Sequence, residues 1–248
     1  GWREDGIFTP YAAFTYDLTP AWTTYASFTE VYKPQNYFAG PAEDPTKLDP
    51  ITGRNYELGA KGSIFEGALN LSIALYSIER DGEAIQDMRY GEGSNFWLPL
   101  GEIVSEGVDL EVSGELAPGW QVQAGYTHKI IRDQSGAKVS TWEPEDQVSF
   151  YTSYKLKGAL DRLTIGGGAR WQGKGWQVLS NNVKKRDEEF AQDPYWLVDL
   201  MARYQLTENL SATLNVNNIF DKKYLRTIAY GAIYGAPRNV GLTLDYKL

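Results

Sequence analysis

The chain lacks several features that define common protein classes. It contains no cysteine, so it forms neither a disulfide framework nor a thiolate metal site. Its formal net charge is −8 and it has no basic cluster, which argues against a nucleic-acid partner. It has no run of about 18 apolar residues, which excludes a transmembrane helix, and no helical period stands out.

Aromatic residues and glycine are abundant instead: the 248 residues include 8 Trp, 17 Tyr and 25 Gly. The segment from Pro237 to Leu248 alternates strictly between apolar and polar or small residues. A period of two indicates a β-strand with one apolar and one polar face. The mean hydropathy of −0.42 is compatible even with a membrane barrel, because alternating strands average to such a value.

The same alternation recurs along the chain and predicts about eleven strands, joined alternately by short turns and long loops. The short turns lie at residues 19–20, 65–67, 117–119, 158–161 and 207–209. The long loops lie at about 33–53, 80–101, 132–144, 173–193 and 221–236. Residues 182–192, in the fourth loop, are the best candidate for a helix, and there we expect a charged loop with at most a short helical turn.

Strand length separates two all-β architectures. Strands of a soluble sandwich or propeller average about five or six residues. The strands expected here have about eleven residues. At about 3.3 Å per residue and a tilt of about 40°, their rise is close to the roughly 25 Å height of the apolar band of an outer-membrane barrel. Tyrosine and tryptophan near strand ends are also typical of membrane interfaces. These residues are Tyr16, Trp22, Trp120, Tyr154, Trp171, Trp196, Tyr204 and Tyr246.

The sequence therefore predicts a transmembrane antiparallel β-barrel with an odd number of strands. Bacterial barrels close with an even number, so we interpret the chain as part of a larger barrel. Its closing strand is expected to pair with residues 210–219 on one edge and with a strand outside this sequence on the other. The charges gather on the faces expected to line the interior: Glu57, Lys61, Asp109, Glu111, Glu115, Arg170, Asp199, Arg203, Asp245 and Lys247.

Several segments jointly point to one family. They read YASFTEVYKPQN (25–36), LDP (48–50) with GRNYELGAKG (53–62), EGVDLE (106–111), NVNNIFDKKY (215–224) and the run 230–239, which contains YGAPRN (234–239). Together they cover nearly the whole chain at family-like spacing. The chain resembles the TonB-dependent outer-membrane receptors, specifically those for ferric siderophores.

This resemblance implies a 22-stranded barrel around an N-terminal plug, of which residues 1–248 are the C-terminal half, strands 12 to 22. The plug and its energy-coupling segment are not in this sequence. The terminal pattern that the barrel-assembly machinery recognises fits Asn239, Gly241, Leu244 and Tyr246. The family's usual terminal aromatic residue is replaced by Leu248.

The resemblance also implies a function: uptake of a ferric siderophore across the outer membrane of a Gram-negative cell, driven by the TonB complex. Outer-membrane lipid would surround the barrel, the iron would arrive within the siderophore, no cofactor is expected, and the protein would not be an enzyme. The alternatives are a TonB-dependent receptor for haem, cobalamin or a glycan, and a passive porin or adhesin. Haem is disfavoured because His128, the single histidine, lies outside the loops.

A ferric siderophore is bulky and often carries an aromatic chromophore or peptide, so it needs aromatic walls, hydrogen-bond donors and cations. Loops longer than about 12 to 15 residues are usually functional. The candidate ligand contacts in these loops are Lys33, Gln35, Tyr37, Trp97, Trp142, Trp176, Arg226, Tyr230 and Tyr234, with Phe38 and Arg89 nearby. Packing of the loops against each other is the competing role for each of them.

Two further groups have structural interpretations that we favour. Asn215, Asn217, Asn218 and Asp221 suggest a metal site, but such residues more often satisfy backbone groups at a strand end. His128 suggests the His–Ser pair of a barrel lipase, yet no G-x-S-x-G motif occurs, and it is expected to be an interfacial residue.

Overall fold

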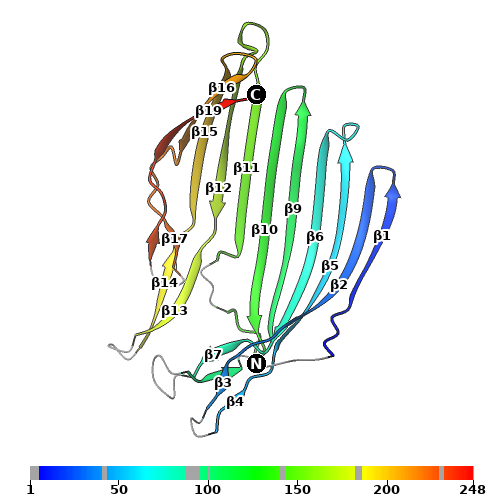
Figure 1. The fold of residues 1–248 in the computed structure, drawn as a ribbon, viewed down its shortest axis with the longest axis vertical. Coiled ribbons are helices and arrows are strands. Elements are labelled where there is room, and N and C mark those ends of the chain that lie inside the picture. The colour runs from blue at the N-terminus through cyan, green and yellow to red at the C-terminus, as the bar shows by residue number, and fades with distance from the viewer. Residues whose placement is uncertain are drawn as a thin grey trace. The chain divides into compact units, whose positions relative to one another are not determined.

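The computed structural model describes residues 6–40, 44–87, 95–99, 101–139, 143–181, 186–228 and 232–247. Its main feature is an 11-stranded sheet in which each long strand lies beside the next one along the chain (Figure 1). The strand order is β1-β2-β5-β6-β9-β10-β11-β12-β15-β16-β19. This confirms the eleven strands predicted from the alternation.

The long strands have 8 to 15 residues each. They are β1 (Tyr11–Thr19), β2 (Trp22–Lys33), β5 (Ile51–Ile64), β6 (Leu69–Asp81), β9 (Ile103–Ala117), β10 (Trp120–Asp133), β11 (Asp146–Lys155), β12 (Leu163–Gln172), β15 (Tyr195–Gln205), β16 (Leu210–Asn217) and β19 (Asn239–Tyr246). Gly158–Leu160 forms a 3-10 turn. No helix in the described part of the chain is long and apolar enough to cross a membrane.

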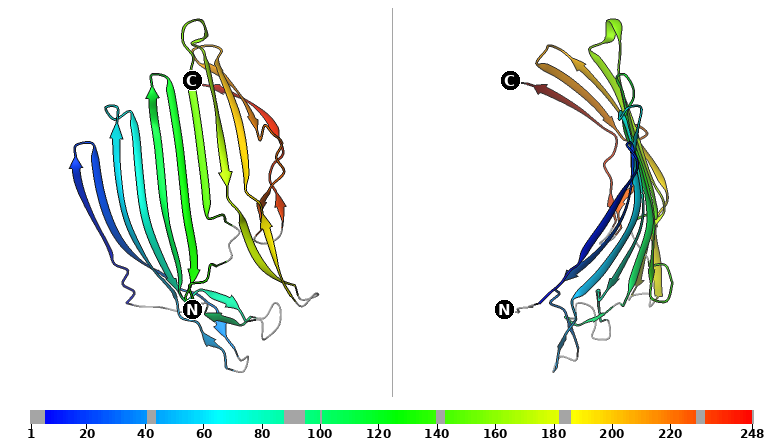
Figure 2. Two further views of the ribbon diagram at one scale, coloured as in Figure 1. Left: turned by 180° about the vertical axis from the view of Figure 1, so that it is seen from behind. Right: turned by 90° about the vertical axis from the view of Figure 1, so that its right-hand side faces the viewer.

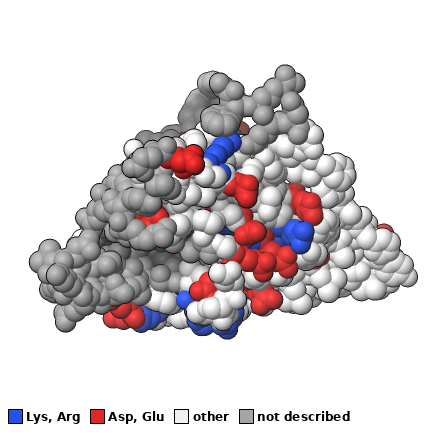
Figure 3. Space-filling model, turned by 90° about the horizontal axis from the view of Figure 1, so that it is seen from below, with Lys and Arg blue, Asp and Glu red and all other residues white. Residues whose placement is uncertain are grey.

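The register of the strands explains the two faces of the sheet. One cross-strand row is apolar throughout: Trp120, Tyr154, Ile165, Ala202, Leu214 and Leu242. A row three residues farther along β10, on the opposite face, contains Gln123, Tyr151, Gly168 and Asp199. The closing strand β19 pairs with β16 from Leu210–Tyr246 to Asn217–Asn239, as the sequence predicted. Charged side chains gather in one part of the surface seen in Figure 3, beside an uncharged area.

Many large apolar side chains of the sheet are exposed. Leu58 is 58% exposed and Leu200 is 51% exposed, although both lie on strands with neighbours on either side. Soluble monomers rarely expose a contiguous apolar face of this extent. The apolar face therefore requires an apolar environment, as a membrane provides.

Four two-stranded sheets occupy the long connections (Figure 2). They are β3 (Phe38–Ala39) with β4 (Thr46–Lys47), β7 (Ala84–Gln86) with β8 (Trp97–Pro99), β13 (Gly175–Asn181) with β14 (Arg186–Gln192), and β17 (Leu225–Thr227) with β18 (Ile233–Tyr234). The expectation of a charged loop with at most a helical turn at 182–192 is wrong, because residues 186–192 form β14. Their backbone groups pair with residues 175–181, a partner that local charge does not reveal.

The chain divides into two compact units. The first comprises Gly1–Ala60, Ala74–Val108 and Lys129–Val139, and the second comprises Lys61–Ile73, Asp109–His128 and Ser140–Leu248. Buried side chains of the first unit include Gln35, Leu48, Asp87 and Ile103. Those of the second include Leu69, Tyr195, Leu197, Ser211, Asn218 and Ile228. Most of these lie in or beside the long connections.

Candidate ligand-binding loops

The predicted ligand contacts fall into two groups of loops, one in each compact unit. We call residues 33–50 with 82–102 the first loop cluster, and residues 173–194 with 218–238 the second. The predicted contacts Trp142 and Tyr230, and Arg89 beside them, lie outside the described residues. The same holds for Leu248 of the assembly signal; Asn239, Gly241, Leu244 and Tyr246 lie on β19.

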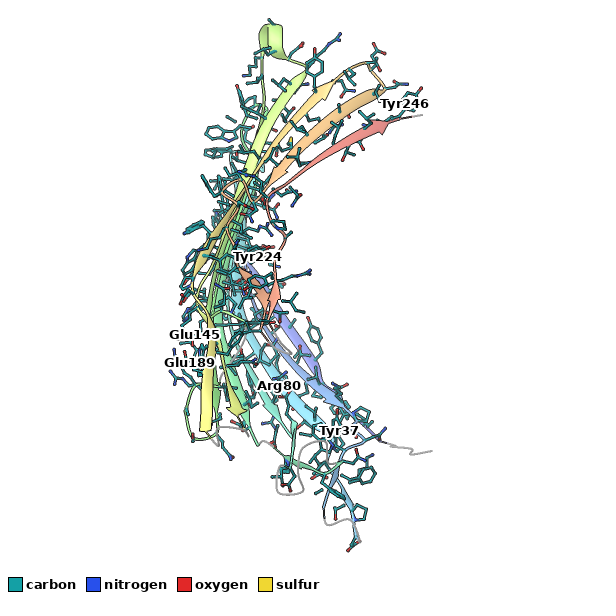
Figure 4. All side chains as sticks on the ribbon, turned by 90° about the vertical axis from the view of Figure 1, so that its left-hand side faces the viewer. Tyr37, Arg80, Glu145, Glu189, Tyr224 and Tyr246 are labelled. Atoms are coloured by element: carbon teal, nitrogen blue, oxygen red, sulfur yellow. The ribbon has the colours of Figure 1, made fainter. Side chains whose placement is uncertain are left out.

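In the first loop cluster the structure brings two predicted contacts together. The rings of Tyr37 and Trp97 lie with centroids 4.2 Å apart at an angle of 38°, although they come from different loops. A bridge between Phe38 and Phe96 links the same two segments. Tyr37, labelled in Figure 4, remains 41% exposed. The pair therefore presents an aromatic surface of the kind that binds a flat chromophore.

Gln35 is buried within the first loop cluster. Its side chain is 6% exposed, and its Nε2 donates hydrogen bonds to the carbonyl oxygens of Asp49 and Gly82. Gly82 has a φ of +84°, and a Cβ there would lie 3.0 Å from the Pro50 carbonyl oxygen. Gln35 thus joins three chain segments and is not on the loop surface, whereas Lys33, at the end of β2, is exposed.

The second loop cluster is built around hairpins. Trp176 lies on β13 opposite Ala191 and is partly exposed. Tyr234 lies on β18 opposite Leu225 and is 72% exposed, and Arg226, on β17, is also exposed. The structure therefore places these three predicted contacts on the surface of one cluster, but no ring contact like that of Tyr37 and Trp97 joins Trp176 to Tyr234 among the described residues.

Residues that the sequence reasoning missed connect these hairpins. The Gln177 Nε2 donates a hydrogen bond to the carbonyl oxygen of Ile228, a residue only 1% exposed. The Gln192 Oε1 accepts one from the Leu225 N–H at 2.7 Å. Tyr224, labelled in Figure 4, packs on Tyr195 with ring centroids 4.8 Å apart. Only Tyr224 had a sequence signal, since it ends the quoted segment 215–224.

The third long connection has an ordered turn after β10. The Asp133 carboxylate accepts hydrogen bonds from the Ser135 hydroxyl and N–H and from the Ala137 N–H. These bonds, that of the Ser135 hydroxyl foremost, lower the pKa of the Asp133 carboxyl. A bridge between Arg132 and Lys138 closes the turn.

Two of the four strand-end residues, Asn218 and Asp221, bond backbone groups as we expected, whereas Asn217 donates to the Asn239 side chain. Asn218, with a φ of 51°, donates to the carbonyl oxygens of Lys222 and Ala236 and accepts from the Lys222 N–H. Asp221, also with a φ of 51°, accepts a hydrogen bond from the Arg238 N–H at 2.9 Å. These side chains fix the exit from β16 toward the second loop cluster.

His128 joins two neighbouring strands. Its Nδ1 lies 2.7 Å from an Asp146 carboxylate oxygen, which also accepts a hydrogen bond from the Tyr126 hydroxyl at 2.8 Å. His128 pairs with Asp146 in the β10–β11 register, so the contact closes the last rung of that ladder. The arrangement accounts for His128 without a catalytic role.

The interior charges bond neighbouring strands. Arg170 lies 3.1 Å from the Asp199 carboxylate, Arg203 donates to the Ser211 hydroxyl at 3.1 Å, and the Asp109 carboxylate accepts from Thr127 at 2.6 Å. Each contact spans two adjacent strands of the sheet. These contacts therefore link neighbouring strands across the polar face.

The fold and loops define a class of outer-membrane receptor. The family described as "TonB dependent receptor-like, beta-barrel" matches residues 1–219, and the chain belongs to it. The chain is located in the outer membrane of a Gram-negative bacterium. Its apolar sheet face therefore contacts lipid, and its polar face lines the interior of the barrel.

Among curated proteins, the chain is 52% identical to the ferripyoverdine receptor of Pseudomonas aeruginosa over 96% of its own length and 30% of that protein's. It is 43% identical to the ferric-pyoverdine 358 receptor of Pseudomonas putida, over 98% of this chain and 29% of that protein. The crystal structure of the ferripyoverdine receptor of Pseudomonas aeruginosa bound to ferripyoverdine matches 99% of this chain with a TM-score of 0.89 at 50% identity. That match covers 33% of the solved chain, so our chain spans about a third of these relatives.

Proposed function

We propose that the receptor containing this chain takes up a ferric siderophore of the pyoverdine class across the outer membrane, energised through the TonB complex. The observation that carries this proposal is the 52% identity to a ferripyoverdine receptor over 96% of the chain, both loop clusters included. The 43% identical relative is also named for a ferric pyoverdine. Iron is cargo within the ligand here, and the protein itself needs no cofactor.

The geometry of the loops supports this proposal. The Tyr37–Trp97 pair, of which Tyr37 is exposed and Trp97 half-buried, offers an aromatic face to a chromophore. Arg226 and Lys33 supply exposed cations for an anionic chelate. In the second unit, Trp176 and Tyr234 supply further aromatic side chains for the ligand. Trp142 and Tyr230, outside the described residues, stay predicted contacts.

The chain supplies the C-terminal half of the barrel domain in this proposal. β1 and β19 are the end strands of the sheet order, and each has one edge for a strand from the other half. The remaining strands and a plug would complete the transporter, with the plug contacting the TonB complex. The barrel-assembly machinery would recognise β19 through Asn239, Gly241, Leu244, Tyr246 and Leu248.

Uptake of radioactive iron tests the function. Deleting the gene in a strain that makes no siderophore of its own should reduce uptake from ferric pyoverdine to background, and the full-length gene should restore it. Deleting the TonB gene should have the same effect.

Two outcomes would contradict different parts of the proposal. Unchanged uptake from ferric pyoverdine together with lost uptake from a hydroxamate chelate such as ferrioxamine would overturn the ligand class alone. Normal uptake from every ferric siderophore tested would overturn the transport function.

A further inference from the structure

A hollow of about 1040 Å³ lies on the lipid-facing side of the second unit. It extends over β10, β11, β12, β15 and β16. Its walls include Trp120, Phe150, Tyr154, Leu200, Leu214 and Val216. The lipid-facing wall of a barrel is an apolar band in contact with lipid, so a depression in this wall is open to an apolar occupant.

Small residues in the middle of the sheet create the hollow. Gly167 lies between Thr152 and Leu200 in the register, and Ala202 lies beside Ile165. Gly167 has no room for a side chain, because a Cβ there would lie 2.7 Å from the Asp199 carbonyl oxygen. The strands approach each other so closely at position 167 that only glycine fits there. Because glycine has no side chain, the surface above it is depressed.

The body of the hollow offers nothing to a polar ligand. The Thr152 hydroxyl accepts from the Trp120 indole N–H at 2.8 Å and donates to the Gln121 carbonyl oxygen at 2.9 Å. The Asp199 carboxylate is bonded to Arg170 on the opposite face of the sheet. An occupant must therefore be apolar over most of its length.

One end of the hollow differs from the rest. It reaches Pro118 and Lys157 in the short turns that follow β9 and β11, and Lys157 is exposed. Short turns of outer-membrane barrels lie on the periplasmic side, where the headgroups of the inner leaflet are found. Trp120 and Tyr154 stand beside this end, as interfacial aromatic residues do. The hollow is thus apolar along the wall and cationic at the headgroup level.

We propose that this hollow binds one glycerophospholipid of the periplasmic leaflet, with an acyl chain along Gly167 and its phosphate at Lys157. Protein and lipid tails are equally apolar, so packing decides what binds there, and an unfilled depression loses dispersion contacts. A flexible chain fills an irregular hollow, while the lysine selects a phosphate at one end. The proposal rests on the membrane placement of the sheet and is independent of the siderophore.

Filling variants of the full-length receptor test the site. Ala169→Leu and Ala202→Leu put larger side chains on the floor, and Lys157→Gln removes the cation. Ala26→Leu, on the same face of β2 in the first unit, and Lys155→Gln, an exposed lysine on β11, are matched controls. The receptors are purified in mild detergent, and bound phosphatidylglycerol is counted by native mass spectrometry.

We expect the parent and both controls to retain one phospholipid that both filling variants lose. Lys157→Gln should weaken phosphatidylglycerol binding about fivefold, the effect of one cation near a lipid surface. An unchanged circular dichroism spectrum of the β-barrel shows that a variant is folded. Equal lipid retention in the filled and parent receptors would overturn the proposal. So would lipopolysaccharide in place of phospholipid, or a receptor dimer that is lost on filling without any lipid.

Discussion

The two loop clusters use the same device in different surroundings. In each, a glutamine side chain donates its amide N–H to a main-chain carbonyl of another segment: Gln35 to Asp49 and Gly82, and Gln177 to Ile228. A pair of tilted aromatic rings also lies in the first cluster, and another joins the second cluster to β15. The ring pairs differ in burial, since Tyr37 is 41% exposed and Tyr195 is 6% exposed.

This difference in burial distinguishes two roles of aromatic residues, ligand binding and stabilisation, which the aromatic content alone does not distinguish. Tyr195, the first residue of β15, is buried. Its hydroxyl donates a hydrogen bond to the Gln172 Oε1 at 2.6 Å, and its ring packs on Tyr224 of the second cluster, so it attaches that cluster to the main sheet. Tyr37 and Trp97 pack on each other at the surface. We therefore expect the first pair to contribute to ligand binding and the second to stability.

The largest effect should come from replacing the two tyrosines in turn. Tyr195→Ala should destabilise the second cluster by about 3 kcal/mol, because it removes a buried ring from a packed site. Tyr37→Ala should leave loop stability nearly unchanged and weaken binding of ferric pyoverdine about tenfold, the loss of one aromatic contact. Hydrogen exchange of the loops and ligand titration measure the two quantities on the full-length receptor.

Conservative variants serve as controls for this pair. Tyr37→Phe should retain most of the affinity, and Tyr195→Phe should lose only the hydrogen bond to Gln172. Equal effects of the two alanine variants on both measurements would show that burial does not distinguish the roles.

An intermediate effect is expected for the glutamines. Gln35→Ala should destabilise the first cluster by about 2 kcal/mol, because it removes two hydrogen bonds to main-chain carbonyl groups. Gln177→Ala removes a bond to one carbonyl and should cost about 1 kcal/mol. The measurement is hydrogen exchange of residues 44–50 and 82–87 compared with 225–228. A larger loss of stability for Gln177→Ala than for Gln35→Ala would contradict this prediction. Gln35→Glu, which replaces a donor by an acceptor, should destabilise the first cluster more than Gln35→Ala.

The long strands were predictable, but these tertiary contacts were not. Alternation reports the environment of each residue on a sheet, so residues such as Leu200 and Leu244 revealed their strands locally. Gln35 is separated from Gly82 by 47 residues, and nothing in its own neighbourhood distinguishes a buried clamp from a surface contact. β14 was missed for a related reason: its charged sequence carries no local strand signal, and it forms a strand by pairing with β13.

The smallest effect concerns a charge pair on that ribbon. The Lys174 Nζ lies 2.5 Å from a Glu189 carboxylate oxygen, and both side chains are about half exposed at 50% and 51%. Exposed pairs contribute about 0.2 to 1 kcal/mol, less at high salt, because water and ions screen them. Lys174→Met should therefore change hydrogen exchange of β13 and β14 by at most a few-fold, and the change should vanish in about 1 M salt. Glu189→Gln should behave alike, and the double variant should add nothing. If Lys174→Met destabilised the second cluster as much as Gln177→Ala, the charge pair, and not the hydrogen bond to Ile228, would hold that cluster together.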